Sequence, residues 1–154
     1  MARIPDREDG AVAPLRVITL VVLVLLIVGG WLGGVAFLIA PDGGAMGMTV
    51  DELPEWPLLG DYTVPGIALI VLFGLLPVAA VVLLVRHRAL GWTATTAVGL
   101  VLVACTLGQI VAIGLPFLAI QAGFLAVGIV LTGLGVDGGA SVGTSDESRR
   151  ALRS

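Results

Sequence analysis

Long apolar runs separated by short polar segments form the main pattern along the chain. The first run covers residues 17–39, and the second covers residues 66–85, after which the Arg86-His87-Arg88 segment follows. Each run is close to the about 20 apolar residues that an α-helix needs to cross the hydrocarbon core of a bilayer. A third stretch, from Trp92 to Val136, contains no charged residue and is too long for a single crossing.

The third stretch is expected to turn back on itself at Gly114-Leu115-Pro116. Glycine relaxes the backbone at this point, and proline both lacks an N–H donor and disfavours helical geometry in the residue before it. The sequence therefore predicts an all-α fold, a bundle of four transmembrane helices. The predicted spans are residues 17–39, 66–85, 92–112 and 117–136.

The distribution of charge predicts how this bundle is oriented. The N-terminal tail (1–16), the short loop after residue 85 and the C-terminal tail (137–154) fall on one side and carry all 8 basic residues, each an arginine. The loop at residues 40–65 carries none, and its acids are Asp42, Asp51, Glu52, Glu55 and Asp61. The positive-inside rule places both termini in the cytoplasm and this acidic loop outside. The C-terminal tail, rich in glycine and serine, is expected to be disordered.

Composition agrees with a membrane location and restricts the chemistry. The chain is 58% hydrophobic and 12% charged, with a mean hydropathy of +1.10, values that soluble domains do not normally reach. A net charge of -3 does not favour a nucleic acid partner. With one histidine, His87, and one cysteine, Cys105, a single chain cannot assemble a zinc or haem site. Neither a metal nor another cofactor is therefore expected.

The predicted spans contain no Asp, Glu, Lys, Arg or His, the groups on which proton relays and coupled transporters usually depend at membrane depth. The chain also has no glycine-rich phosphate loop with its lysine and no nucleophile elbow. His87 is expected on the cytoplasmic side, away from the acids of the loop. These patterns favour a protein without catalytic activity, with an intramembrane enzyme that uses the loop acids as an alternative.

Small and polar residues form one face on each of the last two predicted spans. They recur at alternating intervals of four and three residues, which is the spacing of a single helix face. They are Thr95, Gly99, Leu102, Thr106 and Gln109 in the third span and Gln121, Leu125, Gly128, Thr132 and Gly135 in the fourth. A turn near residue 115 would place Gln109 beside Gln121 and Gly99 beside Thr132. Such faces either close a hairpin, pinned here by a bond between the two glutamines, or orient a ligand in the membrane.

The first span contains a glycine-rich segment, Gly29-Gly30-Trp31-Leu32-Gly33-Gly34. It holds two overlapping pairs of small residues, Gly29 with Gly33 and Gly30 with Gly34, and such pairs let helix backbones approach closely. We expect a groove here, in the outer half of the membrane. Its occupant is another helix of the bundle, the same helix of a second protomer, or a lipid or small ligand.

A proline interrupts the second span. Pro77 lies near its middle and leaves the carbonyl of Phe73 without its usual N–H donor. A distortion of the helix is therefore predicted, which serves either as a gate or, as is commoner in membrane helices, to fit one helix around its neighbours.

The acidic loop contains Thr49-Val50-Asp51-Glu52, which has the pattern of a capping box. It predicts a short helix that Pro54 would soon stop, with carboxylates at the helix start, where the helix dipole favours them. The alternative is a calcium or cationic-ligand site formed by the five loop acids, although the spacing of an EF-hand is not present.

Two segments of the loop and two later glutamines carry a resemblance to a known family. They are Pro41-Asp42-Gly43-Gly44-Ala45-Met46-Gly47-Met48, Asp61-Tyr62-Thr63-Val64-Pro65-Gly66, Gln109 and Gln121. In residues 25–134 the chain resembles a family of small uncharacterised four-span membrane proteins of actinobacteria. The resemblance implies a location in the cytoplasmic membrane of a bacterium, and it implies no reaction or ligand.

Together these patterns favour a non-catalytic membrane protein with an accessory or scaffolding role, acting through helix–helix or lipid contacts in the outer half of the membrane. The expected partners are membrane lipid and either a second copy of the chain or another membrane protein. The alternative is a small oligomeric channel or transporter subunit for a neutral solute, with Gln109, Gln121 and the threonines lining its path.

Overall fold

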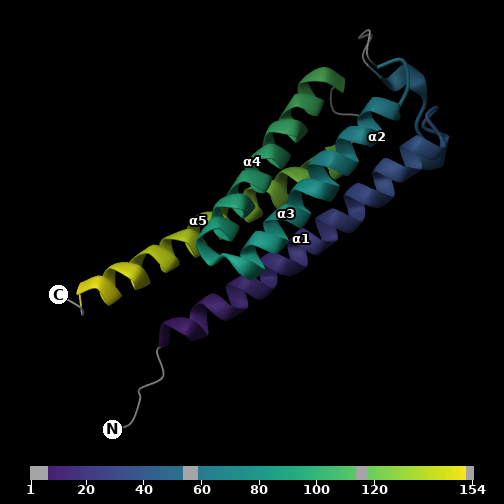
Figure 1. Ribbon diagram of the computed structural model, residues 1–154. Helices are drawn as coiled ribbons and strands as arrows, with labels where there is room; N and C mark the ends of the chain where they lie inside the picture. Colours follow the sequence, from purple (N-terminus) through teal and green to yellow (C-terminus); the bar gives the residue numbers. More distant parts are fainter. Residues whose placement is uncertain (1–6, 54–58, 114–117, 152–154) are drawn as a thin grey trace.

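The protein is a bundle of long helices in the computed structural model, which describes residues 7–53, 59–113 and 118–151 (Figure 1). Its long helical elements are α1 (Arg7–Ile39), α2 (Thr63–Leu69), the π-helix η3 (Ile70–Leu75), α3 (Leu76–Arg86), α4 (Arg88–Ile113) and α5 (Leu118–Ala151). Two short 3-10 helices, η1 (Gly44–Met46) and η2 (Val50–Glu52), lie in the loop after α1. Because α2, η3 and α3 follow one another without a break, they form one helical rod, Thr63–Arg86.

Four helical segments of the described chain are long and apolar enough to cross a membrane. They are Ala13–Ile39, Thr63–Arg86, Ala89–Ala112 and Ala119–Gly143. Each overlaps most of one predicted span, and the fourth extends seven residues beyond its predicted end. The predicted fold class, an all-α bundle of four transmembrane helices, is therefore confirmed, and the chain is a multi-pass membrane protein. The predicted turn at residues 114–116 lies outside the described residues, between the end of α4 and the start of α5.

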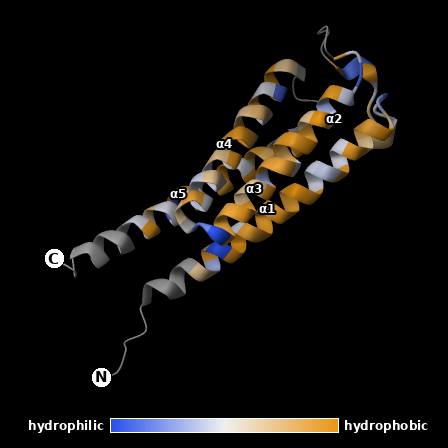
Figure 2. Ribbon diagram, viewed as in Figure 1, coloured by the Kyte–Doolittle hydropathy of each residue, from blue (hydrophilic) through white to orange (hydrophobic). Residues whose placement is uncertain are grey.

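Hydrophobic residues predominate along the helices between the two ends of the bundle (Figure 2). Large hydrophobic side chains point outward from different helices, including Leu32 with 68% of its surface exposed and Val111 with 87%. An apolar surface of this extent is unfavourable in water but matches hydrocarbon. Polar residues gather at the two ends, which we call the loop end (residues 40–62) and the arginine end (the turn between α3 and α4).

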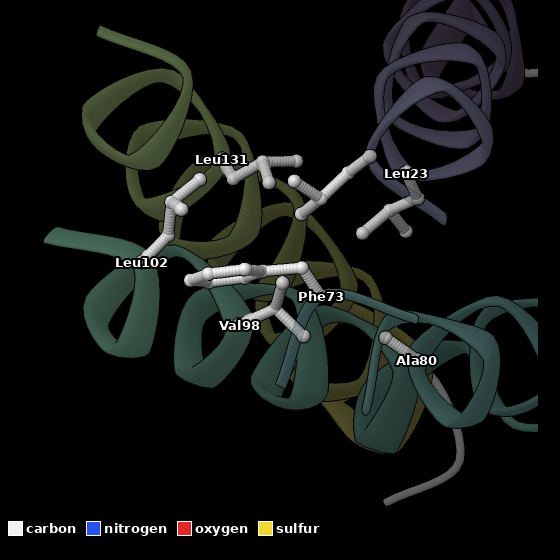
Figure 3. Packing of buried hydrophobic residues seen from close by; sticks show 7 residues of the cluster. Leu23, Phe73, Ala80, Val98, Leu102 and Leu131 are labelled. Atoms are coloured by element: carbon white, nitrogen blue, oxygen red, sulfur yellow. The ribbon is translucent and has the colours of Figure 1, made fainter. Parts of the chain in front are cut away.

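The core lies where the four rods meet (Figure 3). α1 contributes Leu23 and Leu26, η3 contributes Phe73, and the other buried residues of the cluster are Ala80, Val98, Leu102 and Leu131. The Phe73 ring stacks on Phe124 of α5 with ring centroids 6.2 Å apart. In lipid such packing is driven by close van der Waals contact rather than by the hydrophobic effect.

The distortion predicted at Pro77 takes the form of the π-helix η3, which ends just before the proline. Its wider turn is marked by Leu76, whose N–H donates to the carbonyl of Val71 five residues earlier. Pro77 itself is buried in the bundle. Proline removes a helical hydrogen bond, and a local π-turn is one way to rearrange the carbonyls left behind.

Both ends of the chain are more helical than predicted. α1 begins at Arg7, inside the predicted N-terminal tail, and α5 continues to Ala151, through most of the tail predicted to be disordered. The prediction of a disordered tail from residue 137 is therefore corrected. The start of α5's extension packs on α4: a Cβ added at Gly138 would lie 2.5 Å from Cε2 of the Trp92 ring, which is buried. Tertiary contact thus compensates for the low helix propensity of glycine.

Candidate functional site

The seam between α4 and α5 has the register that the sequence predicts. A Cβ added at Gly99 would lie 2.5 Å from Oγ1 of Thr132 and 2.7 Å from the carbonyl oxygen of Gly128. Nearer the arginine end, a Cβ at Gly135 would lie 2.6 Å from the backbone nitrogen of Thr96. Real Cβ atoms are not found so close to backbone atoms, so the two helices approach each other as only glycine permits.

The threonines of this seam bond to their own helices. Thr95 Oγ1 donates to the carbonyl of Gly91 at 2.9 Å, Thr106 Oγ1 to that of Leu102 at 2.8 Å, and Thr132 Oγ1 to that of Gly128 at 2.8 Å. Thr95 and Thr106 are also fully buried. Each hydroxyl has therefore used its one donor within the bundle. In the described residues these hydroxyls therefore donate within their own helices and not across the seam.

The two glutamines differ in their exposure. Gln121 is buried, with 4% of its surface exposed, whereas Gln109 lies on the exposed surface of α4. Among the residues that the structure describes, no hydrogen bond joins the two amides. Gly108 and Gly123, at the same depth, have no other described element within 4 Å of an added Cβ. The close glycine contact of the seam therefore does not extend to the loop end of the hairpin.

The glycine pair Gly30 and Gly34 of α1 packs against the second rod. A Cβ added at Gly30 would lie 2.5 Å from the carbonyl carbon of Phe73, and one added at Gly34 would lie 2.7 Å from the carbonyl oxygen of Gly66. Of the three occupants considered for this groove, another helix of the same bundle is therefore the one found at this pair. We call this side of α1 its closed face.

The closed face also explains how the bundle accommodates Pro77. The carbonyl that this proline deprives of its usual donor belongs to Phe73, and its oxygen lies 2.7 Å from the position of an added Cβ at Gly30. Next to it, the indole Nε1 of Trp31 lies 3.0 Å from an added Cβ at Gly74. Glycines on both rods thus leave room for this backbone carbonyl and for a large aromatic ring.

The second pair, Gly29 and Gly33, lies on another side of α1, which we call its open face. Gly29 is exposed and has no atom of another described element within 4 Å of an added Cβ. A Cβ added at Gly33 would lie 3.5 Å from Cδ1 of Leu69, which is an ordinary van der Waals contact. Leu25 and Leu32 flank the pair on the same face and are 66% and 68% exposed. The open face is therefore a shallow strip of glycine between exposed leucines.

The acids of the loop hold the loop's own backbone. Asp42 Oδ1 accepts from the N–H of Gly44 at 3.0 Å, and Asp61 Oδ1 accepts from the N–H of Thr63 at 2.8 Å, at the start of α2. The predicted capping box is present at η2, where the N–H of Thr49 donates to Glu52 at 3.5 Å. The predicted short helix is thus confirmed as a single 3-10 turn.

The alternative of a cation site in this loop gains no support from these contacts. Asp51 is exposed at η2, and Glu55 lies outside the described residues. In the described part of the chain, no three His, Cys, Asp or Glu side chains come together in a way that could hold a metal ion.

Tyr62 closes the loop end, a role that the sequence analysis missed. Its ring stacks on Phe37 of α1 with centroids 4.8 Å apart, its hydroxyl donates to the carbonyl of Thr49 at 3.0 Å, and its N–H donates to that of Pro41 at 2.8 Å. Burial raises the pKa of the Tyr62 phenol, and the negative charge of Glu52 raises it further. A lone tyrosine at the start of an apolar run was the available signal, since tyrosine is enriched at membrane interfaces.

Arg16 was also missed as a structural residue. Its Nη2 donates to the carbonyls of Leu84 and Val85, at 3.0 and 3.3 Å, so it caps the last turn of α3. Its Nε is buried and has no acceptor among the described residues. The available signal was the position of Arg16 directly before the first span. That end of the first span lies on the same side as the end of the second span.

A shallow groove of about 360 Å³ opens on the outer surface between α4 and α5. Its lining includes Thr93, Ala97, Leu100, Val136 and Gly139. The hydroxyl of Thr93 donates to the carbonyl of Ala89 at 3.3 Å, within its own helix. The groove therefore offers mainly apolar surface.

Comparison with protein-family models, with curated proteins and with solved structures found no match to this chain. The resemblance to a family of actinobacterial membrane proteins therefore stays a prediction.

Proposed function

We propose that this protein is a non-catalytic accessory or scaffolding protein of a bacterial cytoplasmic membrane, with both termini inside, and that it docks a helix of another membrane protein. The open face of α1, in the half of the membrane near the acidic loop, is the docking surface. All arginines lie in the two tails and in the short segment after residue 85, and none lies in the acidic loop, which supports this orientation. The exposure of Gly29, against which no described element packs, is the observation that carries the proposal.

The physical basis is that α1 carries the same motif twice. Gly30 and Gly34 already bring a second helix into backbone contact, and Gly29 and Gly33 present the same spacing to the surroundings. A strip of glycine between the exposed Leu25 and Leu32 offers a groove into which the ridge of a neighbouring helix fits. Lipid chains fill such a groove less completely than a helix of matching shape.

Photocrosslinking in native membranes tests the proposal. A photoreactive residue at Leu32, which is 68% exposed beside the glycine strip, is expected to capture one distinct membrane protein. Gly29→Leu is expected to abolish this capture and to leave the bundle folded. The matched control is Gly133→Leu, because Gly133 is also exposed, on α5, with no described neighbour within 4 Å of an added Cβ. Capture that survives Gly29→Leu, or intramolecular products alone, would contradict the proposal.

A second candidate function is supported by Gln109. Its amide lies on an otherwise apolar surface of α4, beside Leu107 and Val111, and an exposed amide at membrane depth gains from a polar partner. In an oligomer it would line a path between protomers for a neutral solute. Crosslinking of Leu32 to a second copy, together with loss of liposome flux in Gln109→Leu and not in the buried Gln121→Leu, would favour this function over an accessory role.

A further inference from the structure

Two arginines from different helices come together at the arginine end of the bundle. Nη2 of Arg16 is held by the carbonyls of Leu84 and Val85, at 3.0 and 3.3 Å. These carbonyls belong to the last turn of α3, where backbone oxygens lack helical donors and the helix dipole is negative. The guanidinium of Arg16 is therefore fixed in place before any ligand arrives.

Arg86 is the neighbour of this fixed group. It follows Val85 directly, so its Cα lies within about 6 Å of the Arg16 Nη2 atom, given the dimensions of one peptide unit. Its side chain is exposed at the end of α3. The two positive charges therefore belong to the same end of the bundle, where one anion can approach both.

No protein carboxylate supplies that anion among the side chains that the structure describes. Asp42, Asp51, Glu52 and Asp61 belong to the loop end, and Asp137 of α5 is exposed and forms no ion pair with either arginine. The described part of the chain thus leaves Arg16 and Arg86 without a counter-charge.

We propose that Arg16 and Arg86 together bind the headgroup phosphate of an anionic phospholipid. Arg16 precedes the first apolar run and Arg86 follows the second, so both lie where the hydrocarbon core meets the headgroups. Guanidinium groups bind phosphate oxygens through paired hydrogen bonds, and anionic lipids concentrate at this depth on the cytoplasmic side. Because Arg16 is held by two carbonyls, little side-chain freedom is lost on binding.

This site is separate from the proposed docking surface. Arg16 and Gly30 lie on one helix 14 positions apart, which is about 21 Å along the axis. Each proposal can therefore fail while the other holds.

Native mass spectrometry of the full-length protein, titrated with phosphatidylglycerol or phosphatidylcholine in detergent, tests the lipid site. We expect phosphatidylglycerol to be retained in preference to phosphatidylcholine. Arg86→Gln should weaken its binding about fivefold, which corresponds to the roughly 1 kcal/mol contributed by one arginine at an anionic membrane surface. Arg86 is the residue changed because its guanidinium has no hydrogen bond to a described element. Arg16→Gln would also remove a cap from the end of α3.

The matched control is Arg149→Gln with Arg150→Gln, which removes two positive charges from the same side of the protein. This double variant should retain phosphatidylglycerol as the unchanged protein does. An unchanged affinity in Arg86→Gln, an equal loss in the control, or equal retention of the two lipids would overturn the proposal. Displacement of the lipid by millimolar glycerol phosphate would also overturn it, because the site would then bind free phosphate esters.

Discussion

The closed and open faces of α1 carry the same motif one residue apart and have opposite surroundings. On the closed face, an added Cβ at Gly30 would lie 2.5 Å from the backbone of Phe73. On the open face, an added Cβ at Gly29 would meet no atom of the other described elements within 4 Å. A pair of small residues therefore permits close contact without specifying it. The neighbouring rod uses one pair, and its Phe73 carbonyl lies where a side chain at position 30 would stand.

The two faces are expected to differ most in how much stability is lost when their glycines are replaced by a larger residue. Gly30→Leu should destabilise the bundle by about 3 kcal/mol or more, because the new side chain meets backbone, which cannot move aside as a flexible side chain can. Gly29→Leu should change stability by no more than about 0.5 kcal/mol. Loss of helical signal on titration with a denaturing detergent measures both. Equal destabilisation by the two variants would mean that the open face is also packed.

A second seam tests whether the closed face is typical of this bundle. Gly99→Ala should destabilise the protein by about 2 kcal/mol, since its Cβ would lie 2.6 Å from the backbone nitrogen of Thr132. The matched change Gly133→Ala, on the exposed side of α5, should be neutral or slightly stabilising because alanine is the better helix former. The same detergent titration provides the measurement. A neutral Gly99→Ala would show that the α4–α5 hairpin can separate at this depth without cost.

The loop end of the closed face gives a smaller effect. Phe37 lies on this face beyond Gly34 and stacks on Tyr62, whose hydroxyl bonds to the carbonyl of Thr49. Tyr62→Phe keeps the stacking and removes that bond, so we expect a loss of about 1 kcal/mol at neutral pH. Faster hydrogen exchange of the amides around Thr49, with unchanged exchange in α4, would locate the effect.

Tyr62 also predicts a dependence on pH. The pKa of its phenol is raised in the folded protein, so the unfolded chain ionises first as the pH rises above the ordinary tyrosine value of 10.0. The stability that neutral Tyr62 contributes is therefore complete below that pH and is lost as the pH approaches the folded pKa. In Tyr62→Phe this alkaline loss should be smaller than in the unchanged protein. Identical alkaline profiles in the two proteins would contradict the assignment.

The smallest effect is expected at the buried hydroxyls. Thr106→Val preserves shape and removes an oxygen that bonds only to the carbonyl of Leu102 in its own helix. We expect a change of about 0.5 kcal/mol or less in stability. A change several times larger would mean that the hydroxyl also serves a partner across the seam or a ligand.

Several elements could be predicted from residues alone. The four spans follow from the length of the apolar runs, and the pairing of Gly99 with Thr132 follows from helical spacing and the position of one turn. The capping box at Thr49 and Glu52 is local, so its four residues contain the whole signal. Each of these features depends on neighbours in sequence or on a single well-marked turn.

Other features depend on contacts that sequence spacing does not reveal. The glycine-rich start of the predicted tail is helical because Gly138 packs on the ring of Trp92, and nothing in the tail's own composition indicates this contact. Gln109 and Gln121 have the correct register, yet one is exposed and the other buried. This difference in exposure depends on how the two helices lie near the loop end of the hairpin.

The sequence by itself determined the number of spans, their approximate ends and the separation of acids from arginines, because hydrophobic length and charge act on each segment independently of the others. Only the tertiary structure decided which glycines are used for contact and that Arg16 reaches the end of α3. These outcomes depend on the rotation of each helix about its axis. Rotation is set by the shapes of all neighbouring helices together, and in hydrocarbon an apolar residue is stable on either face.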